Sequence, residues 1–249
     1  MEHFVKERRL SLRVEPGTTV SALYRTAPHA AALLVLAHGA GAGMTHPFMT
    51  AMAERLAEAG VSTLRFQFPY MEAGSKRPDR PAVAHAAIRA AVTKATKLAP
   101  ALPLFAGGKS FGGRMASQAQ ALEPLPNVRG LVFLGFPLHP PEKPSVERAA
   151  HLSEIRIPLL FIQGTRDALA QPALLQEVLK SLGKRATYRP VREADHSFGV
   201  LVRSGRRDPE VLSEVAEVAA KWIGKRKGRP RPTPSRRPIR SVGNARKGV

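Results

Sequence analysis

The amino end of the chain alternates apolar and polar residues in two short segments. Residues 7–14 and 18–25 follow this period of two on either side of Pro16 and Gly17. Alternation is typical of strands with one buried and one solvent-facing side, and Pro-Gly is typical of a tight turn. The pattern therefore predicts an antiparallel hairpin.

Beyond residue 30 the pattern changes to continuous apolar runs separated by segments with helical spacing. The apolar runs are residues 31–39, 61–66, 102–108, 130–135 and 157–164. The helical segments are residues 47–59, 83–98, 110–122, 172–182 and 209–223. Strands that are apolar on both sides and alternate with helices favour a mainly parallel sheet covered on both faces. The predicted fold class is α/β, with the antiparallel hairpin at its amino end.

The connection at residues 136–157 holds four prolines and one short helical stretch. It is too short to form a lid domain, so a candidate site at this edge of the sheet is expected to be open. A chain of 249 residues suits one domain with a single core. We place that domain at residues 1–223.

Charge is concentrated at the carboxyl end. The formal net charge is +20, and residues 224–249 contribute ten Lys or Arg and no acidic residue. The remainder has 29 basic and 19 acidic residues, so it carries only +10. Rich in Pro, Gly and Arg, this segment is predicted to be a disordered basic tail. Such a tail either contacts nucleic acid or another polyanion weakly, or is a solvated extension without a specific partner.

The chain contains no cysteine, which excludes disulfides, zinc thiolates and cysteine nucleophiles. Its first ten residues are charged where a signal peptide would be apolar. The longest apolar run, residues 30–37, is far shorter than the roughly 20 residues that span a bilayer. We expect a soluble cytoplasmic protein that does not bind membranes.

The segment LPLFAGGKSFGG, residues 102–113, contains Gly-Lys-Ser. It could therefore belong to a phosphate-binding loop or carry a serine nucleophile. A phosphate-binding loop of the G-x-x-x-x-G-K-[ST] type would need glycine at position 103, which is Pro103. The glycine-rich run after His38 also fails the dinucleotide pattern G-x-G-x-x-G, because its last position is Met44. No nucleotide-binding motif fits.

Residues 108–112 match G-x-S-x-G, with an apolar run before them and helical spacing after them. This is the pattern of a nucleophile elbow, in which a sharp strand-to-helix turn exposes a serine above the sheet. The candidate nucleophile is Ser110. The alternative is a glycine-rich turn in which Ser110 only caps the helix.

A serine nucleophile needs a histidine base and an acid, in the chain order Ser, acid, His for this fold. The histidines after Ser110 are His139, His151 and His196. The aspartates of the chain are Asp79, Asp167, Asp195 and Asp208. Only Asp167 lies between Ser110 and His196 without being adjacent to the histidine, so Ser110, Asp167 and His196 are the predicted triad. A rearranged set with His139 or His151 and a glutamate (Glu123, Glu142 or Glu147) stays open.

Acyl transfer also requires backbone N–H groups for the oxyanion. The predicted donors are Phe111, after the nucleophile, and Ala40, in the glycine-rich loop after residues 31–37, with Gly41 as the reserve; the alternative is a loop that only turns the chain. Candidate pocket walls are Tyr70 or Met71 and, on the opposite side, Phe136. Core packing is the competing interpretation of the aromatic residues.

Several segments resemble the α/β-hydrolase superfamily over nearly all of residues 1–223. LAHGAGAGMTHPFM, RFQFPYMEAGSKRPDRP, GGKSFGGRMAS, LGFPLHPPEKP, IQGTRD and ADHSF are similar to the dienelactone-hydrolase-like group that includes testis-expressed and NSL-complex-subunit-like proteins. The resemblance implies a serine hydrolase fold with Ser110, Asp167 and His196 at the triad positions. It also implies an alternative, because some members of the group are components of chromatin complexes.

The function expected from the sequence is hydrolysis of an ester-like or related acyl bond of a small substrate, with no metal or organic cofactor. The alternative is a non-catalytic binding or scaffold protein that uses its basic tail on nucleic acid or another polyanion. The pattern gives no prediction of the oligomeric state.

Overall fold

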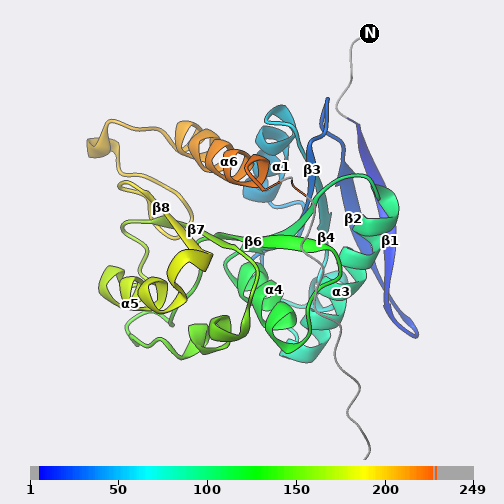
Figure 1. Ribbon diagram of the computed structural model, residues 1–249, viewed down its shortest axis with the longest axis horizontal. Coiled ribbons are helices and arrows are strands. Elements are labelled where there is room, and N and C mark those ends of the chain that lie inside the picture. Colours follow the sequence, from blue (N-terminus) through cyan, green and yellow to red (C-terminus); the bar gives the residue numbers. More distant parts are fainter. Residues whose placement is uncertain (1–5, 227, 229–249) are drawn as a thin grey trace, which may run out of the picture.

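The computed structural model describes residues 6–226 and residue 228. Within them, eight strands form one sheet in the order β1-β2-β4-β3-β5-β6-β7-β8 (Figure 1). The strands are β1 (Glu7–Glu15), β2 (Thr18–Arg25), β3 (Ala32–Ala37), β4 (Val61–Phe66), β5 (Leu104–Lys109), β6 (Val128–Leu134), β7 (Leu159–Gly164) and β8 (Ala186–Val191). The α-helices are α1 (Pro47–Glu58), α2 (Pro69–Glu72), α3 (Pro81–Leu98), α4 (Phe111–Leu122), α5 (Pro172–Leu182) and α6 (Asp208–Gly224). The 3₁₀ helices are η1 (Glu147–Glu154), η2 (Gly183–Arg185) and η3 (Val202–Ser204).

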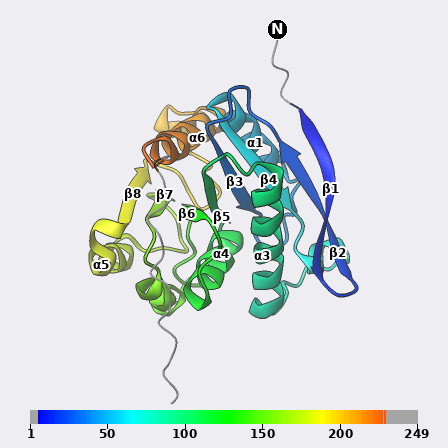
Figure 2. The ribbon, with the colours of Figure 1, turned by 45° about the vertical axis from the view of Figure 1, so that its right-hand side comes forward.

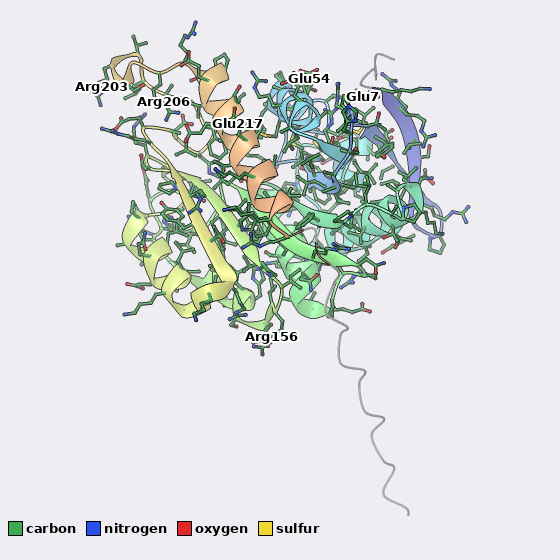
Figure 3. The ribbon with its side chains drawn as sticks, turned by 45° about the horizontal axis from the view of Figure 1, so that its top comes forward. Glu7, Glu54, Arg156, Arg203, Arg206 and Glu217 are labelled. Carbon is green, nitrogen blue, oxygen red and sulfur yellow. The ribbon has the colours of Figure 1, made fainter. Side chains whose placement is uncertain are left out.

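Strands β1 and β2 form the predicted antiparallel hairpin, and β2 joins the rest of the sheet by antiparallel pairing with β4. Gly17 takes a φ of 79° at the turn, which a glycine adopts without steric cost. An ion-pair network fixes the hairpin to the layer above it: Arg25 lies 3.0 Å from Glu7 and 3.4 Å from Glu54 of α1. Figure 3 labels both glutamates at this end of the molecule.

Strands β3, β5, β6, β7 and β8 pair in parallel in that order. Strand β4 pairs in parallel with the other edge of β3. Every residue of β3, β4, β5 and β7 is buried, as expected for parallel strands covered on both faces, including the polar residues of β4. Three of the covering helices, α1, α3 and α5, begin with a proline, whose fixed φ and missing N–H suit a first helical position.

Helices cover both faces of the sheet, and each face has its own apolar core. Helices α1 and α6 lie on one face, over a core that includes Leu34, Phe105 and Trp222. Helices α3, α4 and α5 lie on the other face, where Ile88 and Phe161 belong to the second core (Figure 2). The predicted fold, a mainly parallel sheet with helices on both faces and an amino-terminal hairpin, is confirmed.

The connection after β6 carries η1 and no lid domain in residues 136–157, as expected. The short helices α2, η2 and η3 were not predicted, and α2 is a single turn of four residues directly after β4. Among the described residues no helix has the length and apolar character needed to cross a membrane. Most of the basic tail proposed for residues 224–249 lies outside the described residues, so the tail and its boundary stay predictions.

Candidate active site

Ser110 occupies the sharp turn between β5 and α4, at the carboxyl edge of the sheet. Its φ of 48° and ψ of −115° lie outside the regions that non-glycine residues normally adopt. Such a conformation costs on the order of 1–3 kcal/mol and persists only when its surroundings enforce it. Here the turn is enforced by the hydrogen bonds from the Ser110 N–H to Leu134 O (3.1 Å) and from the Arg114 N–H to Ser110 O (3.1 Å).

The two glycines of the G-x-S-x-G pattern are required by close approach to β3. A Cβ on Gly108 would lie 2.2 Å from the carbonyl oxygen of Ala37, and a Cβ on Gly112 would lie 2.5 Å from that of His38. Real Cβ atoms do not come this close to backbone oxygens. The glycines therefore allow strand, turn and helix to pack together and present the Ser110 side chain at the edge.

Three side chains from distant parts of the sequence meet at this edge. Ser110 Oγ lies 2.8 Å from His196 Nε2, and His196 Nδ1 lies 2.7 Å from Asp167 Oδ2. In this arrangement Nδ1 donates to the carboxylate and Nε2 accepts from the serine hydroxyl. The carboxylate is buried, whereas His196 and Ser110 reach solvent. This is the geometry needed to remove a proton from a serine hydroxyl.

Asp167 is held by two further groups, one of which the sequence did not indicate. Its Oδ1 accepts the Leu169 N–H at 2.8 Å, and its Oδ2 accepts from the side-chain amide of Gln163. Gln163 sits near the end of β7 and also accepts the Phe136 N–H at 2.8 Å. It therefore links the acid to the loop after β6. A buried polar residue inside the apolar run of β7 was the available signal for it.

The glycine-rich loop after β3 is held by His38. The His38 Nδ1–H donates to Gly39 O at 2.7 Å, and Nε2 accepts the Phe68 N–H at 3.1 Å. Burial lowers the pKa of His38 to about 4, against the smaller opposing effect of the hydrogen bond to Gly39. The imidazole is therefore neutral near pH 7 and fixes the loop against the segment after β4.

The predicted oxyanion donors differ in what they already bind. Gly41 donates its N–H to the hydroxyl of Tyr70 at 3.1 Å, so this amide is engaged. Among the described residues, the amides of Ala40 and Phe111 have no hydrogen-bond acceptor. Ala40 is exposed in the loop, and Phe111 opens α4 directly after Ser110.

The predicted pocket residues lie at different depths. Tyr70 is buried and lies edge-on to Phe111, with ring centroids 6.4 Å apart. Met71 is partly buried and lines a hollow of about 570 Å³ between the hairpin and the loop after β3. Phe136 is only 1% exposed and packs against Phe133, with ring centroids 5.2 Å apart, which places it in the core.

Lys109 is the buried cation of the site. Its Nζ donates to the backbone carbonyl of His196 at 2.6 Å and lies 5.9 and 5.6 Å from the ring centroids of Phe48 and Phe198. Burial lowers the pKa of Lys109 to about 8, although the carboxylates of Asp167 and Asp195 favour its charged form. The lysine thus ties the strand before Ser110 to the loop that carries His196.

The other two histidines considered as bases have different partners. His139 Nδ1 donates to Pro140 O at 2.8 Å, and its Nε2 accepts the Gln171 N–H at 3.1 Å. His151 Nε2 lies 2.7 Å from the hydroxyl of Ser117, two turns along α4 from Ser110. Within the described part of the chain, neither histidine forms a hydrogen bond with Ser110.

Comparison with known proteins agrees with this architecture. A family model described as an alpha/beta hydrolase domain matches residues 30–224. Dienelactone hydrolase from Anabaena variabilis is similar in structure, with a TM-score of 0.72, 22% identity, and 91% of this chain and 100% of that chain covered.

Two further solved structures are similar at lower identity. The esterase domain of a Rhodothermus marinus protein has a TM-score of 0.68 and 15% identity, with 90% of this chain and 100% of that chain covered. A serine hydrolase without a lid from Xanthomonas campestris has a TM-score of 0.67 and 18% identity, with 87% and 95% covered. These likenesses describe the fold.

Proposed function

Because the chain belongs to the alpha/beta hydrolase domain family, we propose that it is a serine hydrolase that cleaves an ester or related acyl bond of a small substrate. The observation that carries the proposal is the continuous hydrogen-bonded path from Ser110 through His196 to Asp167, at 2.8 and 2.7 Å. The strained backbone of Ser110 supports it, because such strain is concentrated at functional sites.

In the proposed mechanism, Ser110 Oγ attacks the acyl carbon while its proton moves to His196 Nε2. Asp167 holds the Nδ1–H tautomer and stabilises the imidazolium that forms. The N–H groups of Phe111 and Ala40 donate to the oxyanion. Collapse of the tetrahedral intermediate breaks the bond to the leaving group, which takes the proton from His196.

The acyl-enzyme is then hydrolysed by the same groups. Water gives a proton to His196 Nε2 and adds to the acyl carbon, and the carboxylic acid leaves as Ser110 Oγ takes the proton back. The narrower resemblance to the dienelactone-hydrolase-like group with testis-expressed and NSL-complex-subunit-like proteins belongs to the same proposal. It rests on the sequence segments alone.

A fluorophosphonate probe tests the proposal, because it labels only an activated serine. We expect the full chain to be labelled and the Ser110→Ala variant to lose the label. Ser117→Ala is the matched control, since Ser117 lies on α4, which begins directly after Ser110, and also contacts a histidine. A folded wild type that resists labelling and hydrolyses no short aryl ester would contradict the proposal and favour the scaffold alternative.

The basic tail supports a separate and weaker proposal, a contact with nucleic acid or another polyanion through residues 224–249. Deletion of residues 229–249 should abolish salt-sensitive retention on DNA while ester hydrolysis continues. Retention that survives the deletion would assign it to residues 1–228.

A further inference from the structure

Two arginines near Ser110 have no acidic partner. Arg114 lies in the first turns of α4, and Arg148 lies in η1, which packs against α4. Neither forms an ion pair with any carboxylate of the described residues, and Arg148 lowers the pKa of Arg114 by its charge, after the larger effect of burial. We call these two residues the arginine pair.

Arg114 is partly buried, and its Nε has no acceptor in the described part of the chain. This atom is buried and has no hydrogen-bond partner among the described residues. Arg65 also has a buried Nε without a partner in these residues, but its other two nitrogens pair with Glu7 and donate to Met44 O at 2.9 Å, so its charge is matched by an anion. A cation that loses water without gaining an anion carries a cost in free energy. That cost is relieved when an anion binds.

The neighbouring histidines add no charge to this surface. Ser117 donates its hydroxyl hydrogen to Arg114 O at 2.8 Å, so His151 Nε2 must donate to Ser117 Oγ. Burial lowers the pKa of His151 to about 4, with Arg114 and His85 adding to the effect. His85 is also shifted downward, mainly by burial. Both imidazoles are therefore neutral near pH 7, and the arginine pair is the charged part of this surface.

Arg114 lies close in the chain to the nucleophile, at the start of α4. Ser110 precedes the helix in its strained turn, and Arg114 follows in the first turn of α4, where its backbone N–H donates to Ser110 O at 3.1 Å. The guanidinium carbon of Arg114 lies 6.0 Å from the ring centroid of Phe111. The same Phe111 supplies a proposed oxyanion donor. The Arg114 guanidinium therefore lies beside the residue that directly follows Ser110.

We infer that the arginine pair binds an anionic group at the far end of the acyl chain, so that the preferred substrates are half-esters of short dicarboxylic acids. This inference rests on the proposed hydrolase function. A guanidinium matches a carboxylate with two parallel hydrogen bonds, which a lysine ammonium does not reproduce. Neutral acyl chains of the same length lack this interaction and leave the guanidinium unpaired.

The test compares two esters that differ only at the distal end, 4-nitrophenyl hydrogen adipate and 4-nitrophenyl hexanoate. We expect kcat/KM of the wild type, corrected for uncatalysed hydrolysis, to favour the adipate by about 10-fold or more. Arg114→Met should lower the adipate-to-hexanoate ratio by about 10-fold, Arg148→Met by less. Arg114→Lys should fall between wild type and Arg114→Met, because it keeps the charge and loses the fork.

Arg13→Met is the matched control. Arg13 is exposed on β1, and its loss removes the same unit of net charge without touching the site. Its ratio should equal that of the wild type, and higher salt should lower the wild-type ratio. Inhibition of hexanoate hydrolysis by free adipate provides a second readout, and Arg114→Lys serves if Arg114→Met does not fold.

A wild type that hydrolyses both esters with a ratio near one would overturn the inference and leave the proposed function intact. So would a high ratio that Arg114→Met, Arg114→Lys and Arg148→Met all leave unchanged. A protein that hydrolyses neither ester and takes no fluorophosphonate label would instead contradict the proposed function.

Discussion

Two serine–histidine pairs with nearly equal Oγ–Nε2 distances lie at helix α4, one directly before its first residue and one within it. Ser110 lies 2.8 Å from His196, and Ser117 lies 2.7 Å from His151. The pairs differ in what surrounds the imidazole. His196 is backed by the carboxylate of Asp167 at 2.7 Å, whereas burial and, to a smaller extent, the charge of Arg114 disfavour the protonated form of His151.

The difference shows that a short serine–histidine distance does not by itself make a base. A base must become a cation during the reaction, and only the His196 ring has an anion placed to stabilise that cation. Access differs as well. Ser117 is fully buried, and its hydrogen is already donated to the carbonyl of Arg114, whereas Ser110 reaches solvent from a strained turn.

The largest expected effect separates the two serines. Ser110→Ala should lower kcat/KM for 4-nitrophenyl hexanoate by about 10⁴-fold or more, because it removes the proposed nucleophile. Ser117→Ala should change it by less than a few fold, although the loss of a buried hydrogen bond costs about 1 kcal/mol of stability. Initial rates on both variants check this, and comparable losses in the two would break the comparison.

The next effect concerns the acid behind the histidine. Asp167→Asn should lower kcat by roughly 10³- to 10⁴-fold, because the amide favours the wrong tautomer of His196 and cannot stabilise its cation. The control is Asp195→Asn, since Asp195 adjoins His196 but accepts the N–H groups of Ser197 and Gly199 at 2.8 and 2.9 Å. Single-turnover rates on both variants decide it. A larger loss in Asp195→Asn would reassign the acid.

The sequence predicted the parts of this molecule that depend on local pattern. The hairpin, the buried strands and the glycines around Ser110 follow from periodicity and from what a tight turn allows. The fold prediction is confirmed on those elements. Chain order alone also singled out Asp167 and His196, because few aspartates and histidines follow Ser110.

Contacts between distant segments could not be predicted in this way. The charge of Lys109 suggests an exposed side chain, yet it is buried under the carbonyl of His196. The role of Gln163 depends on its distance from Asp167 across the end of β7. The arginine pair is recognisable only because neither residue forms an ion pair with a carboxylate in the described part of the chain, and the positions of carboxylates follow from the packed structure.

Lys109 gives the third test, which uses the linkage between protonation and folding. Its pKa of about 8 in the folded chain lies below its ordinary value of 10.5. The unfolded chain therefore holds the proton more tightly between these values, and stability from this group rises with pH in that window. Relative to Lys109→Met, the wild type should gain on the order of 2–3 kcal/mol between pH 7 and pH 10.

Urea unfolding of both proteins at the two pH values measures this gain, because the remaining titrating groups cancel in the difference. Parallel pH profiles would mean that Lys109 is hydrated in the folded protein. The Lys109→Met variant should also show lower kcat with little change in KM, since the lost hydrogen bond positions His196 and does not contact substrate.

The smallest expected effect concerns the stability contributed by the Ser117–His151 pair at acid pH. The pKa of His151 is lowered to about 4 in the folded chain, so the unfolded chain binds the proton more tightly between pH 6.5 and pH 4. The stability from this group is therefore fully present above pH 6.5 and is lost as pH falls toward 4. His151→Gln keeps a donor for Ser117 and cannot be protonated. The wild type should therefore lose on the order of 2 kcal/mol more stability than the variant between pH 7.5 and pH 4.5, after discounting for partial exposure.

His38 titrates in the same range, but it is present in both proteins, so its contribution cancels in the difference. If the two proteins lose stability equally, the surroundings of His151 do not oppose its charge, and the contrast between the two serine–histidine pairs must lie in solvent access to the serine alone.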